Sequence, residues 1–243
     1  MKIIINGANG RMGRILDEAV EQGGVHTVAA RIDWSFAAGD GLSALCEYDG
    51  PADLVIDFSN HAATAQVTEY CIKRNLPVIV ATTGQTKEEL ALIDAAAKAV
   101  PVFLSANMSL GVALLADLAK KAAAVFPDAD IEIVEKHHNQ KLDVPSGTAL
   151  LLARRIQEAR PGAEFVVGRH ENGKRTKAEI GIHSLRLGNE VGTHEIIIAT
   201  GSETVTLKHE AENRSLFAQG ALVAAEFLAG KAPGLYDMRD IIE

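Results

Sequence analysis

The chain has 243 residues, of which 47% are hydrophobic and 23% are charged, and its formal net charge is −8. This length allows one large domain or two domains. No apolar run approaches the roughly 20 residues of a membrane-spanning helix, and the acidic balance lacks the broad basic surface of a nucleic-acid-binding protein. We therefore expect neither a membrane nor a nucleic-acid role. The first residues pass straight into a glycine-rich turn, which leaves no room for a secretory signal, so a cytoplasmic location is expected.

The N-terminal segment has the pattern of a strand, a glycine turn and a helix. An apolar run over Lys2–Asn6 is followed by Gly7, Gly10 and Gly13 and then by apolar residues at helical spacing. The first glycine permits a tight turn, the second lets the backbone approach a pyrophosphate, and the third lets the helix pack close to the strand. The spacing G-x-x-G-x-x-G is not the commoner G-x-G-x-x-G, so an ordinary strand-to-helix turn is the alternative interpretation.

Asp33 supports the dinucleotide interpretation. A second strand, about Thr27–Ile32, ends at this residue, roughly 20 residues beyond Gly13. A dinucleotide-binding fold places at this point the acid that binds the hydroxyl groups of the adenosine ribose. The alternative, that Asp33 is a plain turn residue, is therefore the weaker one.

Strands and helices continue to alternate through the first half of the chain, which predicts a parallel sheet. The expected elements are strands Asp53–Phe58, Val78–Ala81 and Val102–Leu104 and helices His61–Arg74 and Lys87–Ala99. Ligands bind beyond the carboxyl ends of such strands. This rule points to Phe58-Ser59, to Ala81–Gly84 and to Ser105–Met108 as neighbours of a nicotinamide, although each segment is also compatible with an ordinary loop or helix cap.

The second half of the sequence changes pattern. After a helix over Leu110–Phe126 and a strand over Ile131–Glu135, we expect the alternation to stop. Three strands follow, Lys177–Leu187, Thr193–Thr200 and Glu203–Glu210, and the last two are joined by a hairpin turn at Gly201-Ser202. A mixed or antiparallel sheet with helices on one face is predicted. If Ile196, Ile198, Val205 and Leu207 lie on its open face they need a partner, which favours an oligomer.

The change of pattern predicts two domains of an α/β protein. A parallel-sheet, dinucleotide-binding domain covers residues 1–106, and a final helix over Ser215–Ala229 with the tail after it is expected to complete that domain through residues 216–243. Residues 107–215 form an α+β domain with the mixed or antiparallel sheet, to which we assign substrate binding and oligomerisation.

The segment from residue 135 to 149 concentrates the chemically active side chains. His137 and His138 can carry protons near neutral pH, and Lys141 adds a positive charge. We expect one histidine to donate a proton and the other to bind. Ser146 is predicted to cap a helix whose first residues, Gly147-Thr148, offer backbone N–H groups to a carboxylate close to the lysine.

Two alternatives for this segment are a metal site and, for Lys141, an ordinary solvated lysine. No nearby cysteine and no His-Glu-x-x-His pattern completes a ligand set, so no metal is expected. The chemistry that joins both halves is reduction: a nicotinamide gives hydride to an electron-poor carbon while a protonated side chain supplies a proton to the neighbouring atom. Carboxylates held by the lysine and the helix N-terminus would make the acceptor electrophilic.

These residues resemble the dihydrodipicolinate reductase family of the diaminopimelate route to lysine. The resemblance runs nearly end to end and is most specific in the pattern Glu-x-His-His-x-x-Lys-x-Asp-x-Pro-Ser-Gly-Thr-Ala, which begins at Glu135. It extends over Gly7–Gly13, Ala81–Gly84, Ala106-Asn107, Arg214 with Phe217-Ala218, and Gly234–Asp240.

The resemblance implies an N-terminal Rossmann-type domain, a central substrate and tetramerisation domain, and a homotetramer. It implies reduction of the cyclic dicarboxylate 4-hydroxy-tetrahydrodipicolinate to tetrahydrodipicolinate, with loss of water, by NADH and/or NADPH. Its proton donors would be His137 and Lys141, and its substrate-binding residues would be His138, Ser146, Gly147 and Thr148. The implied cofactor-binding residues are Gly7, Ala8, Asn9, Gly10, Arg11, Met12, Asp33, Ala81, Thr82, Thr83, Ser105, Ala106, Asn107 and Met108.

Two departures from the family pattern concern the cofactor. Some relatives have a basic residue directly after the ribose-binding acid, able to pair with the 2′-phosphate of NADPH, whereas this chain has Trp34, so that only Arg11 or Arg31 could substitute. The segment from Ser35 to Gly50 is also short. Two other functions stay open from the sequence: a related amino-acid dehydrogenase on the same scaffold, and a non-catalytic module that senses NAD(H) and an acidic metabolite.

Overall fold

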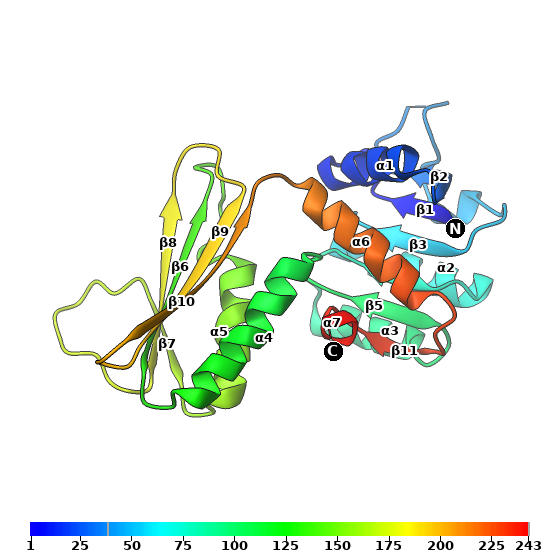
Figure 1. Cartoon of the computed structure of the whole chain (residues 1–243). Coiled ribbons are helices and arrows are strands. Elements are labelled where there is room, and N and C mark those ends of the chain that lie inside the picture. The colour runs from blue at the N-terminus through cyan, green and yellow to red at the C-terminus, as the bar shows by residue number, and fades with distance from the viewer. Residues whose placement is uncertain (38, 243) are drawn as a thin grey trace. The chain divides into compact units, whose positions relative to one another are not determined.

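The computed structural model describes residues 1–37 and 39–242, and they divide into two compact units. One unit contains residues 1–109 together with the segment from residue 214 onward, and the other contains residues 110–213. Each unit holds one sheet with its own helices (Figure 1). None of the helices in the described ranges is long and apolar enough to span a membrane.

The first unit is built on a parallel sheet. Among the described residues it has six strands in the order β11-β5-β4-β3-β1-β2, and every neighbouring pair is parallel. The strands are β1 Lys2–Asn6, β2 Thr27–Ile32, β3 Leu54–Asp57, β4 Val78–Val80, β5 Pro101–Leu104 and β11 Gly234–Tyr236. The central strands are apolar on both faces because both faces are covered. The predicted Rossmann-type parallel sheet is therefore confirmed.

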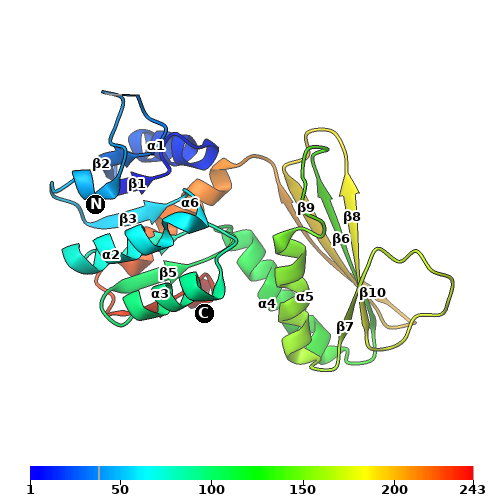
Figure 2. The same cartoon turned by 180° about the vertical axis from the view of Figure 1, so that it is seen from behind.

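Helices cover both faces of this sheet. They are α1 Arg11–Gly23, α2 Thr64–Arg74, α3 Lys87–Ala96, α6 Ser215–Leu228 and α7 Arg239–Ile242, with 3₁₀ turns η1 Leu45–Glu47 and η2 His61–Ala63. The α1 and α6 helices lie against each other on the face seen in Figure 1, and α2 and α3 lie on the face seen in Figure 2. The C-terminal segment adds β11 at the sheet edge, where Leu235 pairs with Val102.

The second unit contains a mixed sheet covered by two helices. In the described residues the strand order is β10-β9-β6-β8-β7. The strands are β6 Asp130–His137, β7 Glu164–Val167, β8 Glu179–Arg186, β9 Gly192–Ala199 and β10 Thr204–Ala211, and the helices are α4 Leu110–Val125 and α5 Gly147–Ala159. Strands β6, β8 and β7 run parallel, whereas β9 is antiparallel to both β6 and β10. The expected mixed sheet is thus confirmed.

One prediction about this unit is wrong, and the condition on which a partner was expected is not met. The alternation of strands and helices does not stop at residue 135, because α5 leads into the short strand β7, which runs parallel to β6. Nor do Ile196, Ile198, Val205 and Leu207 lie on the open face. The two isoleucines are fully buried in the core formed with α4 and α5, and Val205 and Leu207 pack against that core. The argument for a partner that covers these four residues therefore fails.

Candidate active site

The glycine turn after β1 has no space for larger side chains. Gly7 has a φ of 82°, and a Cβ atom there would lie 2.7 Å from the Ser59 backbone. A Cβ on Gly13 would lie 2.1 Å from the carbonyl oxygen of Gly7. Gly10 precedes the first turn of α1 without a side-chain cap. The backbone N–H groups at this helix N-terminus are thereby open to phosphate oxygens, so the turn fits a dinucleotide.

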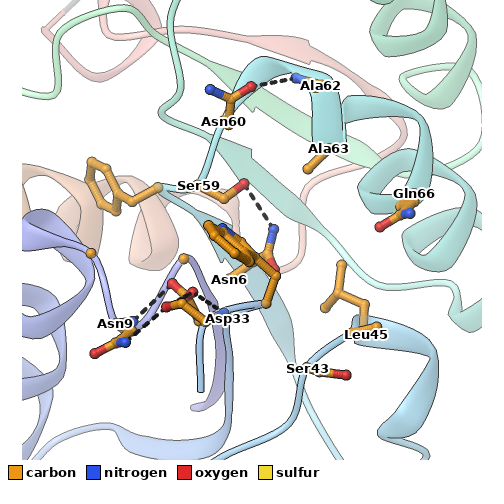
Figure 3. A pocket seen from close by; sticks show the side chains of 16 residues that line it. Asn6, Asn9, Asp33, Ser43, Leu45, Ser59, Asn60, Ala62, Ala63 and Gln66 are labelled. Carbon is orange, nitrogen blue, oxygen red and sulfur yellow. Dashed lines mark hydrogen bonds between the residues drawn. The ribbon is translucent and has the colours of Figure 1, made fainter. Parts of the chain in front are cut away.

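Asp33 connects this turn to the segment that follows β2. Asp33 is only 9% exposed. Its Oδ2 accepts a hydrogen bond from the Asn9 backbone N–H at 3.1 Å, and its Oδ1 accepts bonds from the Ser35 N–H at 2.9 Å and the Ser35 hydroxyl at 2.6 Å. Figure 3 shows the contact between Asn9 and Asp33. The predicted ribose-binding acid is therefore fixed beside the glycine turn, at the end of its strand.

A cavity of about 640 Å³ lies over these groups within the first unit. Of the predicted cofactor residues, Gly7, Asn9, Gly10 and Asp33 line it. Its wall also contains residues that the sequence analysis did not assign to the cofactor, among them Asn6, Trp34, Ser43, Leu45, Asn60 and Gln66. Figure 3 shows the Asn6 side chain meeting Ser59, with the amide donating to the serine Oγ at 3.1 Å. A polar residue that ends an otherwise apolar strand was the available signal for Asn6.

The other predicted cofactor residues do not line this cavity as far as the described residues show. Ala8, Arg11 and Met12 belong to the turn and the start of α1, while the remaining ones follow the carboxyl ends of β4 and β5. Local hydrogen bonds order these two loops. Gln85 donates to the Thr82 carbonyl at 3.0 Å, and the Ser105 hydroxyl donates to the Asn107 carbonyl at 2.7 Å. Because the strands are parallel, both loops lie beyond the carboxyl ends of the strands, on the same side of the sheet as the glycine turn.

The second unit places a carboxylate beside the predicted proton donor. Glu135 and His137 lie two residues apart on β6, so both point to the helix-covered face. The carboxylate is fully buried, and its Oε2 lies 2.5 Å from Nδ1 of His137. Arg186 donates to both oxygens of Glu135 at 2.9 Å. Burial raises the pKa of the Glu135 carboxyl, but the bonds from His137 and Arg186 outweigh it and hold the pKa well below its ordinary value.

An ionised Glu135 fixes the hydrogen on His137. A carboxylate only accepts hydrogen bonds, so Nδ1 must be the donor, and this assignment leaves Nε2 for other partners. Gly192 lies next to that nitrogen, because a Cβ at this position would be 3.0 Å from Nε2. The absence of a side chain on Gly192 therefore keeps the space beside Nε2 open.

Lys141 is held in the loop between β6 and α5. Its Nζ lies 2.9 Å from Oδ1 of Asp143. Burial raises the pKa of the Asp143 carboxyl, but the hydrogen bond and charge of Lys141 outweigh it and lower the pKa. Arg186 also donates to the Asp143 carbonyl at 2.7 Å. At the start of the loop, His138 donates its backbone N–H to the Glu190 carbonyl at 2.8 Å.

Ser146 caps α5 as predicted. Its Oγ accepts a hydrogen bond from the Ala149 N–H at 3.2 Å, and its own N–H donates to Oε1 of Glu135 at 3.2 Å. Gly147 opens the helix, and a Cβ there would meet nothing within 4 Å. Thr148 follows in the same first turn. The helix N-terminus is thus anchored to the buried carboxylate and remains open at its first residue.

Sequence reasoning missed His194 on β9. The residue is 4% exposed, its Nε2 lies 3.1 Å from Oγ of Ser146, and its ring is edge-on to that of His137 at a centroid distance of 5.2 Å. Burial lowers the pKa of His194 to about 3, and the nearby charges of His137 and Lys141 act in the same direction. Both predicted proton donors therefore lie close enough to affect one buried ring. The sequence signal was weak, because a lone histidine in a strand is usually structural.

Comparisons with known proteins match the whole chain to one family. The family model for the N-terminus of dihydrodipicolinate reductase matches residues 1–108, and the model for the C-terminus matches residues 111–242. The chain is 44% identical to the 4-hydroxy-tetrahydrodipicolinate reductase of Caldanaerobacter subterraneus, over 100% of this chain and 98% of that protein. It is 41% identical to the corresponding reductase of Caulobacter vibrioides, over 100% and 97%.

A solved structure is similar over the same extent. The dipicolinate-bound dihydrodipicolinate reductase from Paenisporosarcina sp. TG-14 superposes with a TM-score of 0.82 and 28% identity, and the match covers 99% of both chains. Both family models and the full-length relatives thus agree on one assignment: this chain belongs to the dihydrodipicolinate reductase family.

Proposed function

We propose that this chain is a 4-hydroxy-tetrahydrodipicolinate reductase that uses NADH or NADPH in lysine and diaminopimelate biosynthesis. The observation that carries the proposal is the buried Glu135–His137 pair at the capped start of α5, in a chain that matches the family over its whole length. The net reaction consumes the hydroxylated ring, one reduced nicotinamide and one proton, and it yields tetrahydrodipicolinate, oxidised nicotinamide and water.

The first unit would hold the dinucleotide. The N–H groups at the start of α1 are suited to the pyrophosphate, and Asp33 has a carboxylate oxygen able to accept from a ribose hydroxyl beside its present partners. We assign the nicotinamide end to the loops after β4 and β5, residues 81–83 and 105–108, because they share the sheet edge with the glycine turn. When bound, the reduced nicotinamide supplies the hydride.

The second unit would hold the substrate and deliver the proton. A ring carboxylate would accept from Ser146 and from the first N–H groups of α5, with Lys141 and His138 completing its binding. His137 would donate its Nε2 proton to the ring, because Glu135 at Nδ1 stabilises the doubly protonated imidazole. Lys141 would act as a second proton donor. Binding both carboxylates through N–H groups and cations draws electron density from the acceptor double bond.

Assay of the purified chain tests this function. We expect loss of reduced nicotinamide absorbance when the cyclic dicarboxylate is supplied, and none with open-chain 2-oxo acids and ammonia. Oxidation that depends on an open-chain substrate alone would favour an amino-acid dehydrogenase. Tight dinucleotide binding with no turnover of any dicarboxylate would favour a sensing module. The cytoplasmic location expected from the sequence stays a prediction.

We propose that the chain forms a homotetramer through the face of the second sheet that points away from α4 and α5. Val134, Leu185 and Ile197 occupy positions on this face by strand alternation, and Leu185 is 41% exposed. Apolar positions on an otherwise uncovered sheet favour burial against another copy. Light scattering should give four times the monomer mass, and Ile197→Lys should lower it. A monomer in the unmutated protein would contradict this proposal.

A further inference from the structure

His194 joins the residues assigned to catalysis without belonging to the predicted site. It lies on β9 directly across from Glu135 on β6. Its Nε2 is 3.1 Å from Oγ of Ser146, and its ring meets that of His137 at an interplanar angle of 74°. Glu135 in turn bonds to both His137 and Ser146. The four residues, with Ser146 contributing its backbone N–H as well as its hydroxyl, therefore form a closed ring of contacts around the start of α5.

The position of the hydrogen on His194 follows from its surroundings. The ring stays neutral near pH 7 because burial strongly lowers its pKa, so it carries a single N–H. Nδ1 is buried and has no hydrogen-bond partner within the described part of the chain. A buried N–H without an acceptor is rarer and more costly than an unfilled acceptor. The hydrogen therefore belongs on Nε2, where Oγ of Ser146 accepts it.

This assignment decides what the Ser146 hydroxyl can do. A hydroxyl oxygen accepts two hydrogen bonds and donates one. The N–H of Ala149 and the Nε2–H of His194 take both acceptor positions. The hydroxyl hydrogen is then left for a third group, and at Gly147, the next residue, an added Cβ would meet no atom beyond its chain neighbours within 4 Å. The geometry suits an anionic acceptor at the helix N-terminus.

We propose that His194 is a positioning residue: with its hydrogen on Nε2, it holds the Ser146 hydroxyl as a donor to a substrate carboxylate and supports the His137 ring edge-on. This inference rests on the proposed function and adds a residue to it. A neutral His194 also places no second positive charge beside His137, so the proton donor is not opposed at close range. The other ionisable groups that act on His194 are Glu135, Lys141 and His209.

Binding of pyridine-2,6-dicarboxylate to the full chain tests the proposal. The matched variants are His194→Gln, whose amide N–H reaches the place of Nε2, and His194→Phe, which keeps the ring and loses the donor. We expect His194→Phe to raise the dissociation constant about tenfold, the effect of misdirecting one charge-assisted bond. His194→Gln should restore most of the affinity. Calorimetry should give an unchanged dissociation constant for NADH in both.

A double-mutant cycle separates this role from a structural one. If His194 acts through the hydroxyl, His194→Phe should cause no further loss in a Ser146→Ala background. Additive losses, equal affinity for the Phe and Gln variants, or unchanged affinity in His194→Phe would overturn the proposal. Should His194→Phe not fold, His194→Asn replaces it, because its amide reaches the place of Nδ1 and should also fail to restore binding.

Nitrogen NMR of histidine-labelled protein reads the tautomer directly. We expect the hydrogen of His194 on Nε2 at pH 7, and a hydrogen on Nδ1 would refute the assignment. Failure of the positioning role of His194 is distinguishable from failure of the proposed reductase function. If the unmutated chain reduces the cyclic dicarboxylate while the His194 variants bind normally, only the positioning role is lost, whereas absent turnover in the unmutated chain would remove the function itself.

Discussion

Nδ1 of His137 donates a hydrogen bond of 2.5 Å to Oε2 of Glu135, a carboxylate with no exposed surface. This contact fixes the ring and directs Nε2 outward from the pair. Because the glutamate stays ionised, it can only accept this bond, which keeps a hydrogen on Nδ1 of the ring.

Glu135→Gln should lower kcat by roughly 10²-fold, because a neutral amide neither fixes the tautomer of His137 nor stabilises its charged form. The affinity for NADH should not change, since the dinucleotide groups belong to the other unit. Steady-state kinetics and calorimetry measure the two quantities. A kcat close to that of the unmutated enzyme would show that the pair is structural.

Gly192→Ala should reduce kcat about tenfold, because the added Cβ would lie 3.0 Å from Nε2 of His137 and push the ring from its place. Gly162→Ala is the matched control: a Cβ there meets nothing within 4 Å. Both variants should unfold at nearly the same urea concentration. Equal kcat in the two would contradict the view that Gly192 keeps the donor accessible.

NADH should bind about tenfold more tightly than NADPH. None of the described residues that line the pocket around Asp33 is a lysine or arginine. Of the basic residues considered from the sequence, Arg31 is held by Asp17 and Glu21 at 2.8 and 2.6 Å, and Arg11 is not part of the pocket wall. A 2′-phosphate would therefore meet the Asp33 carboxylate with no lysine or arginine in the pocket wall to neutralise it.

Trp34→Arg should narrow the difference in affinity between NADH and NADPH, and Trp34→Gln should not. The tryptophan lines the pocket directly after Asp33 and is 87% exposed, so a guanidinium there could reach the phosphate without disturbing the core. Dissociation constants for both cofactors, measured by calorimetry, check the prediction. A preference for NADPH in the unmutated chain would refute the predicted preference for NADH.

Acid should destabilise the protein partly through His194. Its pKa falls from 6.5 in the unfolded chain to about 3 in the fold, so the unfolded state alone takes up a proton as the pH drops below 6.5. The contribution of the neutral His194 to the free energy of unfolding is fully present above pH 6.5 and is lost as the pH falls toward 3. Between pH 7 and pH 5 the free energy of unfolding should fall by roughly 1–2 kcal/mol because of His194. Urea unfolding of His194→Gln should show a fall that is smaller by this amount. An identical pH dependence in the variant would contradict the assignment.

Much of the architecture could be predicted because local patterns and tertiary packing agree. The apolar strand Lys2–Asn6 is buried by helices on both faces, and the Ser146 cap forms where the sequence places it. The features that could not be predicted depend on contacts between residues that are distant in sequence. Strand β7 has four residues and too little pattern to detect, and the face occupied by Ile196 depends on where α4 and α5 pack.

The candidate site could be predicted only as far as one segment of the chain. The run from Glu135 to Thr148 contains the donor, its carboxylate and the helix start, so sequence proximity revealed them together. His194 and Gly192 approach through β9, some 50 residues later, and Arg186 through β8. No local pattern links these residues to His137, because strand pairing alone brings them to it.

The most direct test compares turnover and cofactor binding in His137→Gln and Lys141→Ala. If these side chains deliver protons to the substrate, kcat should fall by about 10²-fold or more. The dissociation constant for NADH should stay within about twofold, because neither change removes a group assigned to the dinucleotide. Parallel loss of turnover and NADH affinity, or turnover that survives both substitutions, would contradict the account.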